Sequence, residues 1–494
     1  MDRLARTAGG GTLGGEAPKA GLLGENGPVT RIAIIGGGPG GYEAAHVAVG
    51  LGAEVMIIDH DGLGGACVLT DCVPSKTLIA SSARVSAIRD AHELGLAISD
   101  TSAIDLKAVN QRVKALARAQ SEDIHQRLLR EGVTVVSGFA RFAAKQGTRT
   151  YVLDIGDDEG NSIDSIEADI VLIASGSTPR ELPGSETDGE RILSWRDVYE
   201  LDELPEHLIV VGSGVTGAEF ASAYSEIGVA VTLVSSRDRV LPGEDPDAAD
   251  VIEQVFTSRG GKLEKNARAK SVRRSGDGVV CELGDGQIVT GSHALMCVGS
   301  IPNTANLGLD NVGVHLDGRG YVKVDRVSRT NVGSIYAAGD CTGVLPLASV
   351  AGMQGRIAMW HALGEAVSPL RLRTVAANIF THPEIATVGI GHESSTAGPI
   401  PARTVMLPLA TNARAKMEGM VEGFIKVHCR AATGVVLGGT VVAPNASELI
   451  FPLTLAVQKG LNVSDLAATI GVYPSLSGSL AEASRRLMEH DDLE

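Results

Sequence analysis

Hydrophobic residues between Arg31 and Lys76 form two short runs, which flank a glycine-rich turn and a segment of helical pattern. The runs are RIAII at residues 31–35 and EVMIID at residues 54–59. Short apolar runs on either side of a helical segment are typical of a βαβ unit. The same order returns at His207, where HLIVV leads into glycines, a helical segment and AVTLV. The pattern therefore predicts an α/β fold with two Rossmann-like dinucleotide-binding units.

The turn of the first unit carries Gly36, Gly38 and Gly41 in a GxGxxG spacing. In such a turn the first glycine permits the tight bend, the second lets the backbone approach a pyrophosphate, and the third lets the helix pack on the strand. The helix N-terminus then offers N–H groups and its dipole to the phosphates. Asp59 stands eighteen residues after Gly41, where an acid accepts from a ribose hydroxyl. These features predict a dinucleotide site; a glycine turn without a ligand is the alternative.

The second unit repeats GxGxxG at Gly212, Gly214 and Gly217, but it ends differently. Ser235 stands eighteen residues beyond Gly217, where the first unit has Asp59. Without a carboxylate there is no charge repulsion against a 2′-phosphate, and Arg237 is close enough in sequence to pair with one. The second unit is therefore expected to prefer NADPH and to accept NADH. The alternative is that Arg237 is an ordinary exposed arginine.

Two cysteines, Cys67 and Cys72, follow the first unit and precede Pro74. Proline is favoured in the first turn of a helix, so a helix is expected to start at residues 73–74, with Cys72 at its N-terminus. There the helix dipole would lower the pKa of the Cys72 thiol. Five residues of regular helix would separate the two Cα atoms by roughly 8 to 9 Å, beyond disulfide reach of about 7 Å. The segment must be distorted if the two sulfurs pair, and two structural cysteines are the alternative.

Beyond the cysteines, the pattern alternates helices and strands. A helix is expected over residues 106–132 and a single strand over residues 132–142. Buried strands are expected at residues 169–179, 294–298 and 334–340, followed by a helix at 354–364 and then by β-rich segments from about Arg371.

Composition limits the function. A chain of 494 residues is long enough for about three domains. A net charge of −16 argues against nucleic acid as a partner. No apolar run reaches the roughly 18 residues of a transmembrane helix. The six cysteines show one close pair, which fits a reducing, cytoplasmic setting and neither a disulfide framework nor a metal site. Residues 1–28 hold eight glycines and no periodic pattern, which predicts a disordered tail.

The segment GGACVLTDCVPSK, residues 64–76, resembles the redox-active motif of the flavoprotein disulfide reductases, the group that contains dihydrolipoyl dehydrogenase, glutathione reductase and mercuric reductase. The resemblance extends from about Val29 to the C-terminal region. It implies FAD on the first unit, with Cys72 nearest the flavin and Cys67 as the exchanging sulfur. It also implies an exchangeable nicotinamide on the second unit, a pairing of Lys76 with Glu219 beside it, and a C-terminal domain that forms a homodimer.

The resemblance divides the chain into an FAD-binding domain at 29–189, an NAD(P)-binding domain at 190–303, a segment returning to the FAD domain at 304–368, and an α+β dimer-interface domain at 369–494. The catalytic residues that it implies are Cys67, Cys72, Lys76 and Glu219. The cofactor contacts that it implies, beyond the glycines, Asp59, Ser235 and Arg237 above, are Gly65, Ala66, Lys76, Gly138, Ala140, Ser175, Gly176, Gly299, Asp340, Leu347 and Ala348.

The chain departs from the family at one point that matters for function. Relatives carry a His-Pro-x-x-x-x-Glu segment whose histidine serves as the acid and base of disulfide exchange; here Tyr473 and Gly478 hold these positions. A tyrosine with a pKa near 10 is a poor substitute, and loss of a general acid–base costs about 10² to 10⁴ in rate. No cysteine follows Cys429, so the C-terminal thiols of mercuric reductase are absent too.

The first half of the cycle needs none of the lost residues. The part of the family that the chain most resembles is the actinobacterial dihydrolipoyl-dehydrogenase-like proteins that act as NAD(P)H:quinone reductases. This resemblance implies that electrons pass from flavin directly to a quinone. The alternatives are a dihydrolipoyl dehydrogenase or another disulfide reductase that uses Cys67 and Cys72, a transhydrogenase, and a flavin-bearing thiol redox sensor without enzymatic activity.

Overall fold

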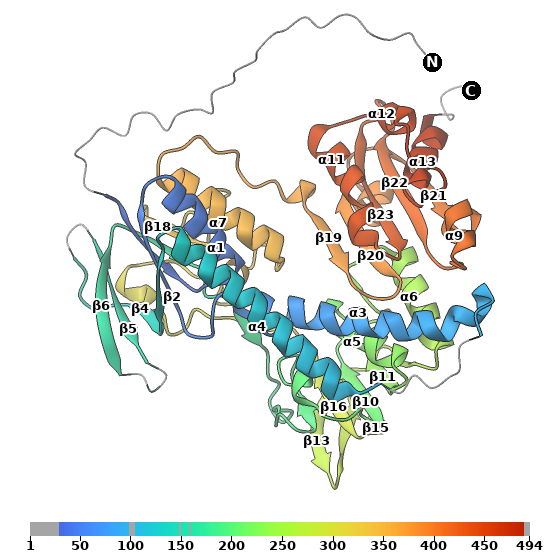
Figure 1. The fold of residues 1–494 in the computed structure, drawn as a ribbon, viewed down its shortest axis with the longest axis horizontal. Coiled ribbons are helices and arrows are strands. Elements are labelled where there is room, and N and C mark those ends of the chain that lie inside the picture. The colour runs from blue at the N-terminus through green and yellow to red at the C-terminus, as the bar shows by residue number, and fades with distance from the viewer. Residues whose placement is uncertain (1–28, 98–103, 148–149, 158, 160, 489–494) are drawn as a thin grey trace, which may run out of the picture.

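The computed structural model describes residues 29–97, 104–147, 150–157, 159 and 161–488. The tail predicted over residues 1–28 lies outside them. Three five-stranded sheets organise the described chain, and Figure 1 shows the first toward the left, the second below and the third at the upper right.

The first sheet is parallel, with the order β18-β7-β1-β2-β3, and it gathers strands that are distant in sequence. Its strands are β1 (Arg31–Ile35), β2 (Glu54–Asp59), β3 (Thr134–Ser137), β7 (Ile170–Ile173) and β18 (Ile335–Ala337). The helices nearest to it are α1 (Pro39–Gly50), α4 (Leu106–Arg130) and α7 (Ala348–Ala362). Strand β18 follows all strands of the second sheet in the sequence, so the chain returns to the first sheet there. The long helix predicted from residue 106 is present as α4.

The second sheet is also parallel, with the order β12-β11-β10-β16-β9. Its strands are β9 (Ile192–Leu193), β10 (His207–Val211), β11 (Ala230–Val234), β12 (Lys262–Glu264) and β16 (His293–Met296). Its helices are α5 (Val215–Glu226) and α6 (Pro246–Ser258), and a small antiparallel sheet is formed by β13 (Ala269–Ser275), β14 (Gly278–Leu283) and β15 (Ile288–Gly291). Both parallel sheets thus begin with the predicted βαβ unit.

The third sheet is antiparallel, with the order β19-β20-β23-β22-β21. Its strands are β19 (Ala376–Ile379), β20 (Glu384–Gly389), β21 (Ala402–Pro408), β22 (Phe424–Arg430) and β23 (Val436–Ala443). The helices of this region are α8 (His392–Ala397), α9 (Ala413–Met417), α10 (Ala446–Leu449), α11 (Phe451–Lys459), α12 (Val463–Ala468) and α13 (Gly478–Met488). Together the sheets confirm the α/β class with a C-terminal α+β part.

Three of the predicted elements were wrong in their bounds. The single strand expected over 169–179 is β7 in the first sheet and then β8 (Ser177–Pro179) in a separate two-stranded sheet, because the chain leaves the first sheet after residue 173. The single strand expected over 132–142 is two strands, because the chain bends at Gly138, whose φ is +151°. The strand β3 stays in the first sheet, whereas β4 (Phe139–Phe142) joins an antiparallel sheet with β5 (Tyr151–Gly156) and β6 (Ser162–Ala168). The helix expected from residue 354 begins at Ala348, so its N-terminus reaches the first sheet.

A buried ion pair joins the second and third sheets. Lys426 on β22 is 2% exposed, and its Nζ lies 2.7 and 2.8 Å from the two carboxylate oxygens of Asp245, which caps α6. Asp247 lies 2.5 Å from the same ammonium. Asp245, Asp247 and His392 bring possible metal ligands within 4.8 Å of one another, but the Lys426 ammonium already supplies positive charge to both carboxylates. We therefore interpret this cluster as a structural ion pair that holds the two sheets together.

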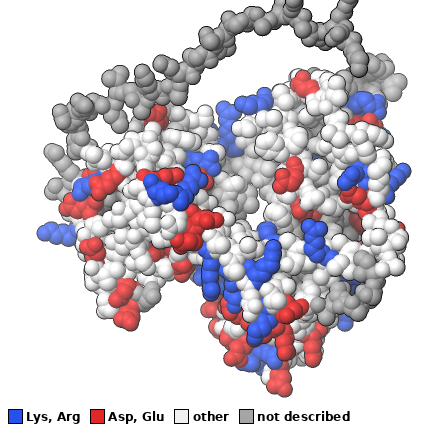
Figure 2. All heavy atoms as spheres, viewed as in Figure 1, with Lys and Arg blue, Asp and Glu red and all other residues white. Residues whose placement is uncertain are grey.

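Across the described residues, no helix has the length and apolar character needed to span a bilayer. On the face drawn in Figure 2, Lys and Arg side chains lie among Asp and Glu side chains.

Candidate active site

The two glycine turns are built alike, which explains why the glycines are required. A Cβ on Gly36, whose φ is +103°, would lie 2.3 Å from the carbonyl oxygen of Ala174; at Gly212, with a φ of +109°, the corresponding distance to the oxygen of Cys297 is 2.2 Å. In the same way, Gly41 and Gly217 pack on Gly36 and Gly212. The third glycine of each turn therefore lets its helix pack against its strand, as the spacing predicts.

The middle glycines have a different role. Gly38 and Gly214 are the N-caps of α1 and α5, and no side chain caps either helix. A Cβ on either glycine would meet no atom within 4 Å, so open space lies above both helix N-termini. Uncapped N–H groups that face open space are a ready site for phosphate.

The first turn therefore fits a flavin dinucleotide. Asp59 at the end of β2 is fixed by N–H groups of Gly37 and Gly62, each 2.6 Å from a carboxylate oxygen. Gly65, at the start of α2 (Gly65–Leu69), comes so close to Gly38 that a Cβ would lie 2.9 Å from the Gly38 Cα. The Gly38 turn, Asp59 and the α2 N-terminus thus surround one place in the fold, which is where the FAD pyrophosphate and ribose are expected.

The remaining residues expected near the flavin lie around the same sheet edge. Asp340 follows β18, and its carboxylate accepts from the Ser177 hydroxyl at 2.8 Å, while burial raises its pKa. Leu347 is the N-cap of α7 and Ala348 its first residue. Ser175 and Gly176 follow β7, and the carbonyl oxygens of both accept hydrogen bonds from Asn303.

The same region contains the crossing between the first two sheets. The strands β8 (Ser177–Pro179) and β17 (Ser300–Pro302) pair antiparallel where the chain leaves the first sheet and returns to it, and Gly299 accepts from the Arg180 N–H beside them at 2.9 Å. Gly138 and Ala140 lie near Asp59, because the Gly138 N–H donates to the Asp59 carbonyl at 3.0 Å. Contact of these residues with the cofactor stays a prediction of the resemblance.

The two cysteines lie on separate helices. Cys67 is on α2 and Cys72 is the first residue of α3 (Cys72–Arg89), so Thr70 and Asp71 interrupt what would otherwise be one helix. Both are free thiols and are hydrogen-bonded to each other. The distortion required for the pair is therefore present, and Ala66 lies next to it on α2. The helix starts one residue earlier than predicted.

The predicted direction of the Cys72 pKa was wrong. The hydrogen bond from the Cys72 thiol lowers the pKa of Cys67, whereas the same bond, together with burial, raises the pKa of Cys72. The reason is that a hydrogen-bonded pair holds its first negative charge on one sulfur, and the partner then keeps its proton. The dipole of α3 does not override this local bond.

Lys76 and Glu219 meet between the first two sheets. The Lys76 Nζ, on α3, lies 2.7 Å from an oxygen of Glu219, on α5, and the Glu219 side chain is 4% exposed. Burial disfavours the charged form of Lys76, but the interactions with Glu219, Cys72 and Asp71 together outweigh it and the pKa of Lys76 is raised. The pair that the resemblance implies is therefore formed, with Lys76 held in its charged form.

The third sheet also reaches Glu219, which the sequence did not reveal. The second carboxylate oxygen accepts from the backbone N–H of Phe380 at 2.9 Å. The Phe380 ring lies over Lys76, with the Nζ 5.0 Å from its centroid. Glu219 thus connects residues of all three sheets. No motif predicts a bond to a backbone amide that is 161 residues away.

Ser235 is turned into the protein interior. Its side chain is 1% exposed, and its hydroxyl bonds with the Ser213 hydroxyl at 2.7 Å and with the Arg237 backbone. Ser235 therefore shapes the loop after β11, while Arg237 is exposed on that loop. Contact of Arg237 with a 2′-phosphate stays a prediction.

The C-terminal segment that holds the positions of the relatives' His-Pro-x-x-x-x-Glu is exposed in the single chain. Ile470, Val472 and Tyr473 are 99%, 78% and 85% exposed, and Gly478 begins α13. Exposed apolar residues of this kind are typical of an interface between protein chains.

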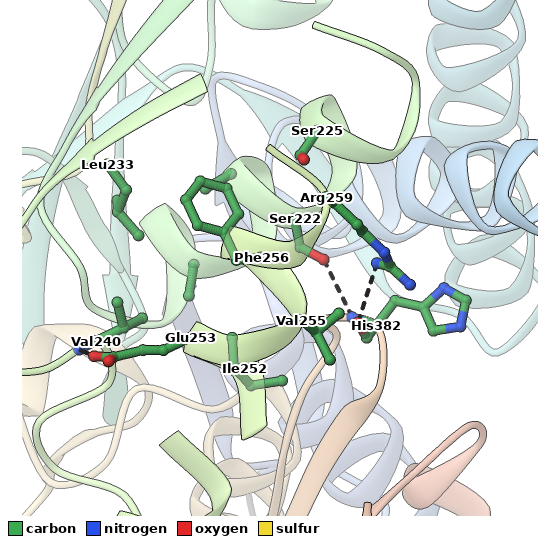
Figure 3. Close-up of a pocket in the computed structure, with 12 residues that line it drawn as sticks. Ser222, Ser225, Leu233, Val240, Ile252, Glu253, Val255, Phe256, Arg259 and His382 are labelled. Atoms are coloured by element: carbon green, nitrogen blue, oxygen red, sulfur yellow. Dashed lines mark hydrogen bonds between the residues drawn. The ribbon is translucent and has the colours of Figure 1, made fainter. Parts of the chain in front are cut away.

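The pocket in Figure 3 is separate from these groups. It lies between α5 and α6 and is mostly apolar, with Ser222, Arg259 and His382 at its edge. The Ser222 hydroxyl accepts from the His382 N–H, and Arg259 donates to the His382 carbonyl. Neither a cysteine nor the pair of Lys76 and Glu219 lines it, so we assign this pocket no role in the chemistry.

Comparison with known proteins agrees with this geometry. Residues 30–355 match the pyridine nucleotide-disulphide oxidoreductase family, and residues 375–484 match its dimerisation domain. An NAD(P)H dehydrogenase (quinone) of Mycobacterium tuberculosis H37Rv is 58% identical over 94% of this chain and 95% of its own length. Dihydrolipoyl dehydrogenase 2 of Haloarcula marismortui is 33% identical over 92% of this chain and 96% of its own length.

Solved structures agree as well. The crystal structure of LpdA from M. tuberculosis superposes with a TM-score of 0.89 at 57% identity and covers 93% of this chain and all of that one. A flavoprotein disulfide reductase induced by HOCl in Escherichia coli, RclA, gives 0.81 at 25% identity, over 92% of this chain and 99% of that one. The family uses FAD and NAD(P)H, the two dinucleotides that the twin glycine turns fit. With both family domains matched and both glycine turns formed, the chain belongs to the pyridine nucleotide-disulphide oxidoreductases.

Proposed function

We propose that this chain is a homodimeric, FAD-dependent NAD(P)H:quinone oxidoreductase. NAD(P)H gives a hydride to the flavin, and the electrons pass from the flavin directly to a quinone. One observation carries the proposal. The ion pair of Lys76 and Glu219, which the resemblance places beside the nicotinamide, is formed, whereas Tyr473 and Gly478 replace the acid–base pair of disulfide exchange. The name of the mycobacterial relative that is 58% identical supports it.

The residues of this chain have distinct roles in the proposal. FAD, when bound, accepts two electrons and one hydrogen from NAD(P)H and passes them on. The Gly38 and Gly214 turns hold the two pyrophosphates, and Asp59 holds the ribose of the flavin nucleotide. Glu219 keeps Lys76 charged, and the Lys76 ammonium orients the reacting edge of the flavin.

The proposed division of the chain follows the sheets. Residues 29–189 and 304–368 hold FAD, residues 190–303 hold NAD(P)H, and residues 369–494 form the dimer. We also propose a cytoplasmic location, supported by the buried, unbridged thiols of Cys281 and Cys341.

The test is a side-by-side steady-state assay of the purified holoenzyme with menadione or lipoamide as acceptor and with NADPH or NADH as donor. We expect menadione turnover to exceed lipoamide turnover by about 10² or more, the cost of a missing general acid–base. Faster turnover of lipoamide or of another low-molecular-weight disulfide would overturn the proposal.

A second candidate is a dihydrolipoyl dehydrogenase, favoured by the hydrogen-bonded thiols of Cys67 and Cys72. The paired substitution Tyr473→His with Gly478→Glu tests it by restoring the acid–base residues. If the site is otherwise intact, lipoamide turnover should rise well above that of the unaltered chain. Substantial lipoamide turnover before the substitution would instead favour this second candidate.

A further inference from the structure

Asp71 is a carboxylate in the middle of the redox motif that the function above does not use. It lies directly before Cys72 and is the N-cap of α3, where an aspartate normally accepts a hydrogen bond from the first turn of its helix. Here its side chain makes no such cap. The helix is instead started by the backbone, because the Asp71 carbonyl accepts from the Ser75 N–H at 2.8 Å.

The backbone of Asp71 is fixed while its carboxylate is not. The Asp71 N–H donates to the Ala66 carbonyl at 2.7 Å, which joins the end of α2 to the start of α3. Among the described residues, no donor is hydrogen-bonded to either carboxylate oxygen. An aspartate that is held at its backbone, partly buried and uncommitted at its side chain is suited to exchange a proton.

The surroundings of Asp71 contain groups of both signs from several elements. Some charged groups influence the pKa of Asp71, and Asp71 influences the pKa of others. These groups are Cys67 on α2, Cys72 and Lys76 on α3, Arg196 before the short helix Val198–Glu200, Tyr199 within it, Glu219 on α5, Cys297 after β16, and Asp340 after β18. This set includes both thiols and the pair of Lys76 and Glu219. Asp71 therefore lies close both to the thiols of the redox motif and to the pair of Lys76 and Glu219.

Burial is the main influence on its protonation. It raises the pKa of Asp71 to about 6, and the positive charge of Lys76 opposes this only in part. A carboxyl with a pKa near 6 is protonated in about one molecule in ten at pH 7 and also releases its proton readily. The chain thus has a proton-exchanging group within the redox motif itself.

We propose that Asp71 is the proton carrier of quinone reduction, an inference that rests on the proposed function. Quinone needs two electrons and two hydrogens to become hydroquinone. NAD(P)H supplies a hydride, which contains both electrons and one hydrogen. The O–H bond of Asp71 breaks to supply the remaining proton to the quinone oxygen, and Asp71 then takes a proton from solvent. The sum is NAD(P)H, one proton and quinone giving NAD(P)⁺ and hydroquinone.

The first test separates the two half-reactions of the holoenzyme. In Asp71→Asn, reduction by NADPH without oxygen should proceed at the rate of the unaltered enzyme, because it requires no proton from Asp71. Reoxidation by menadione should be slower by about 10² to 10⁴. The matched control is Asp90→Asn at the exposed end of the same helix, which should change neither rate. Asp71→Glu should restore part of the reoxidation rate.

The pH profile gives a second readout. Because the carboxyl must be protonated to donate, the reoxidation rate of the unaltered enzyme should fall as pH rises through about 6. Asp71→Asn should lack this limb, while the KM for menadione should be unchanged. An Asp71→Asn enzyme that keeps both the limb and the full rate would overturn the proposal.

A third readout does not depend on turnover. Infrared difference spectra of the oxidised holoenzyme between pH 5 and pH 7 should contain a carboxyl C=O band that is lost in Asp71→Asn and kept in Asp90→Asn. A band that persists unchanged in Asp71→Asn would contradict the assignment. If the unaltered enzyme reduces no quinone, the proposed function fails and this inference fails with it; if it reduces quinone and Asp71→Asn reduces it equally well, this inference fails alone.

Discussion

The Lys76 Nζ lies 2.7 Å from a carboxylate oxygen of Glu219, and this contact joins the helix that follows the redox motif to the helix of the second glycine turn. The contact brings together residues 143 positions apart in the sequence. A buried pair of this kind has a measurable signature, because removal of one partner leaves the other as an uncompensated charge.

Lys76→Met should therefore lower the free energy of unfolding by about 3 kcal/mol. Glu219→Gln should cost less, because the amide can still accept from Phe380, and the double variant should cost less than the sum of the two. The measurement is urea unfolding of the holoenzyme. Lys107→Met, which breaks the exposed pair with Asp202, is the control and should have no measurable effect. Strict additivity of the Lys76 and Glu219 effects would contradict coupling between them.

How much of this site could be predicted from sequence depended on how far apart along the chain the interacting residues lie. The glycine spacings predicted both turns correctly, because the three glycines of each motif lie within six residues, although Gly36 and Gly212 also meet backbone that is distant in sequence. The Lys76 and Glu219 pair came from the resemblance and is present. The bond from Phe380 to Glu219 and the bend at Gly138 were missed, because each depends on a neighbour from another sheet. The inward turn of Ser235 was missed because it depends on Ser213, which lies 22 residues away, and on the backbone of its own loop. The Cys72 pKa was wrong because the hydrogen bond from one thiol to the other outweighs the helix dipole.

The cysteines offer a test of the route that electrons take. If electrons leave from the flavin, Cys67→Ser and Cys72→Ser should each keep menadione turnover within the same order of magnitude, since neither sulfur carries charge to the quinone. Steady-state assay with NADPH measures this, with the buried Cys281→Ser as control. A loss as large as that caused by removing the flavin would place the thiols on the route.

Coenzyme preference should depend on Arg237. Arg237→Ala removes the exposed guanidinium expected to meet the 2′-phosphate, so the KM for NADPH should rise about tenfold, as for loss of a charged hydrogen bond, while that for NADH should not change. Arg141→Ala, an exposed arginine on β4, is the control. An unchanged ratio of NADPH to NADH efficiency would exclude Arg237 as the reader of the phosphate.

Acid should destabilise the fold through His428. Burial lowers the pKa of His428 to about 4, and its Nδ1 bonds with the Thr404 hydroxyl at 2.8 Å. The unfolded chain binds a proton at about pH 6.5, so it is favoured as pH falls from 6.5 to 4, and about 3 kcal/mol of stability is lost over that range. Above pH 6.5 both states are neutral and His428 contributes no pH dependence.

The corresponding variant is His428→Gln, which cannot be protonated in either state. Its free energy of unfolding, followed by urea denaturation at intervals between pH 7 and pH 4, should fall less steeply than that of the unaltered chain. His125→Gln, on the exposed face of α4, should leave the slope unchanged. Identical slopes for the unaltered chain and His428→Gln would rule out this histidine as the origin of acid sensitivity.

The near-identity of the two glycine turns has an evolutionary consequence. The same turn is used twice and is expected to fix only where a pyrophosphate lies. The residues at or just after the end of the second strand of each unit are expected to distinguish one nucleotide from another. Those residues are Asp59 in one copy and the loop around Arg237 in the other. Single substitutions on an exposed loop can therefore change which electron donor this enzyme prefers, without disturbing the packing of either sheet.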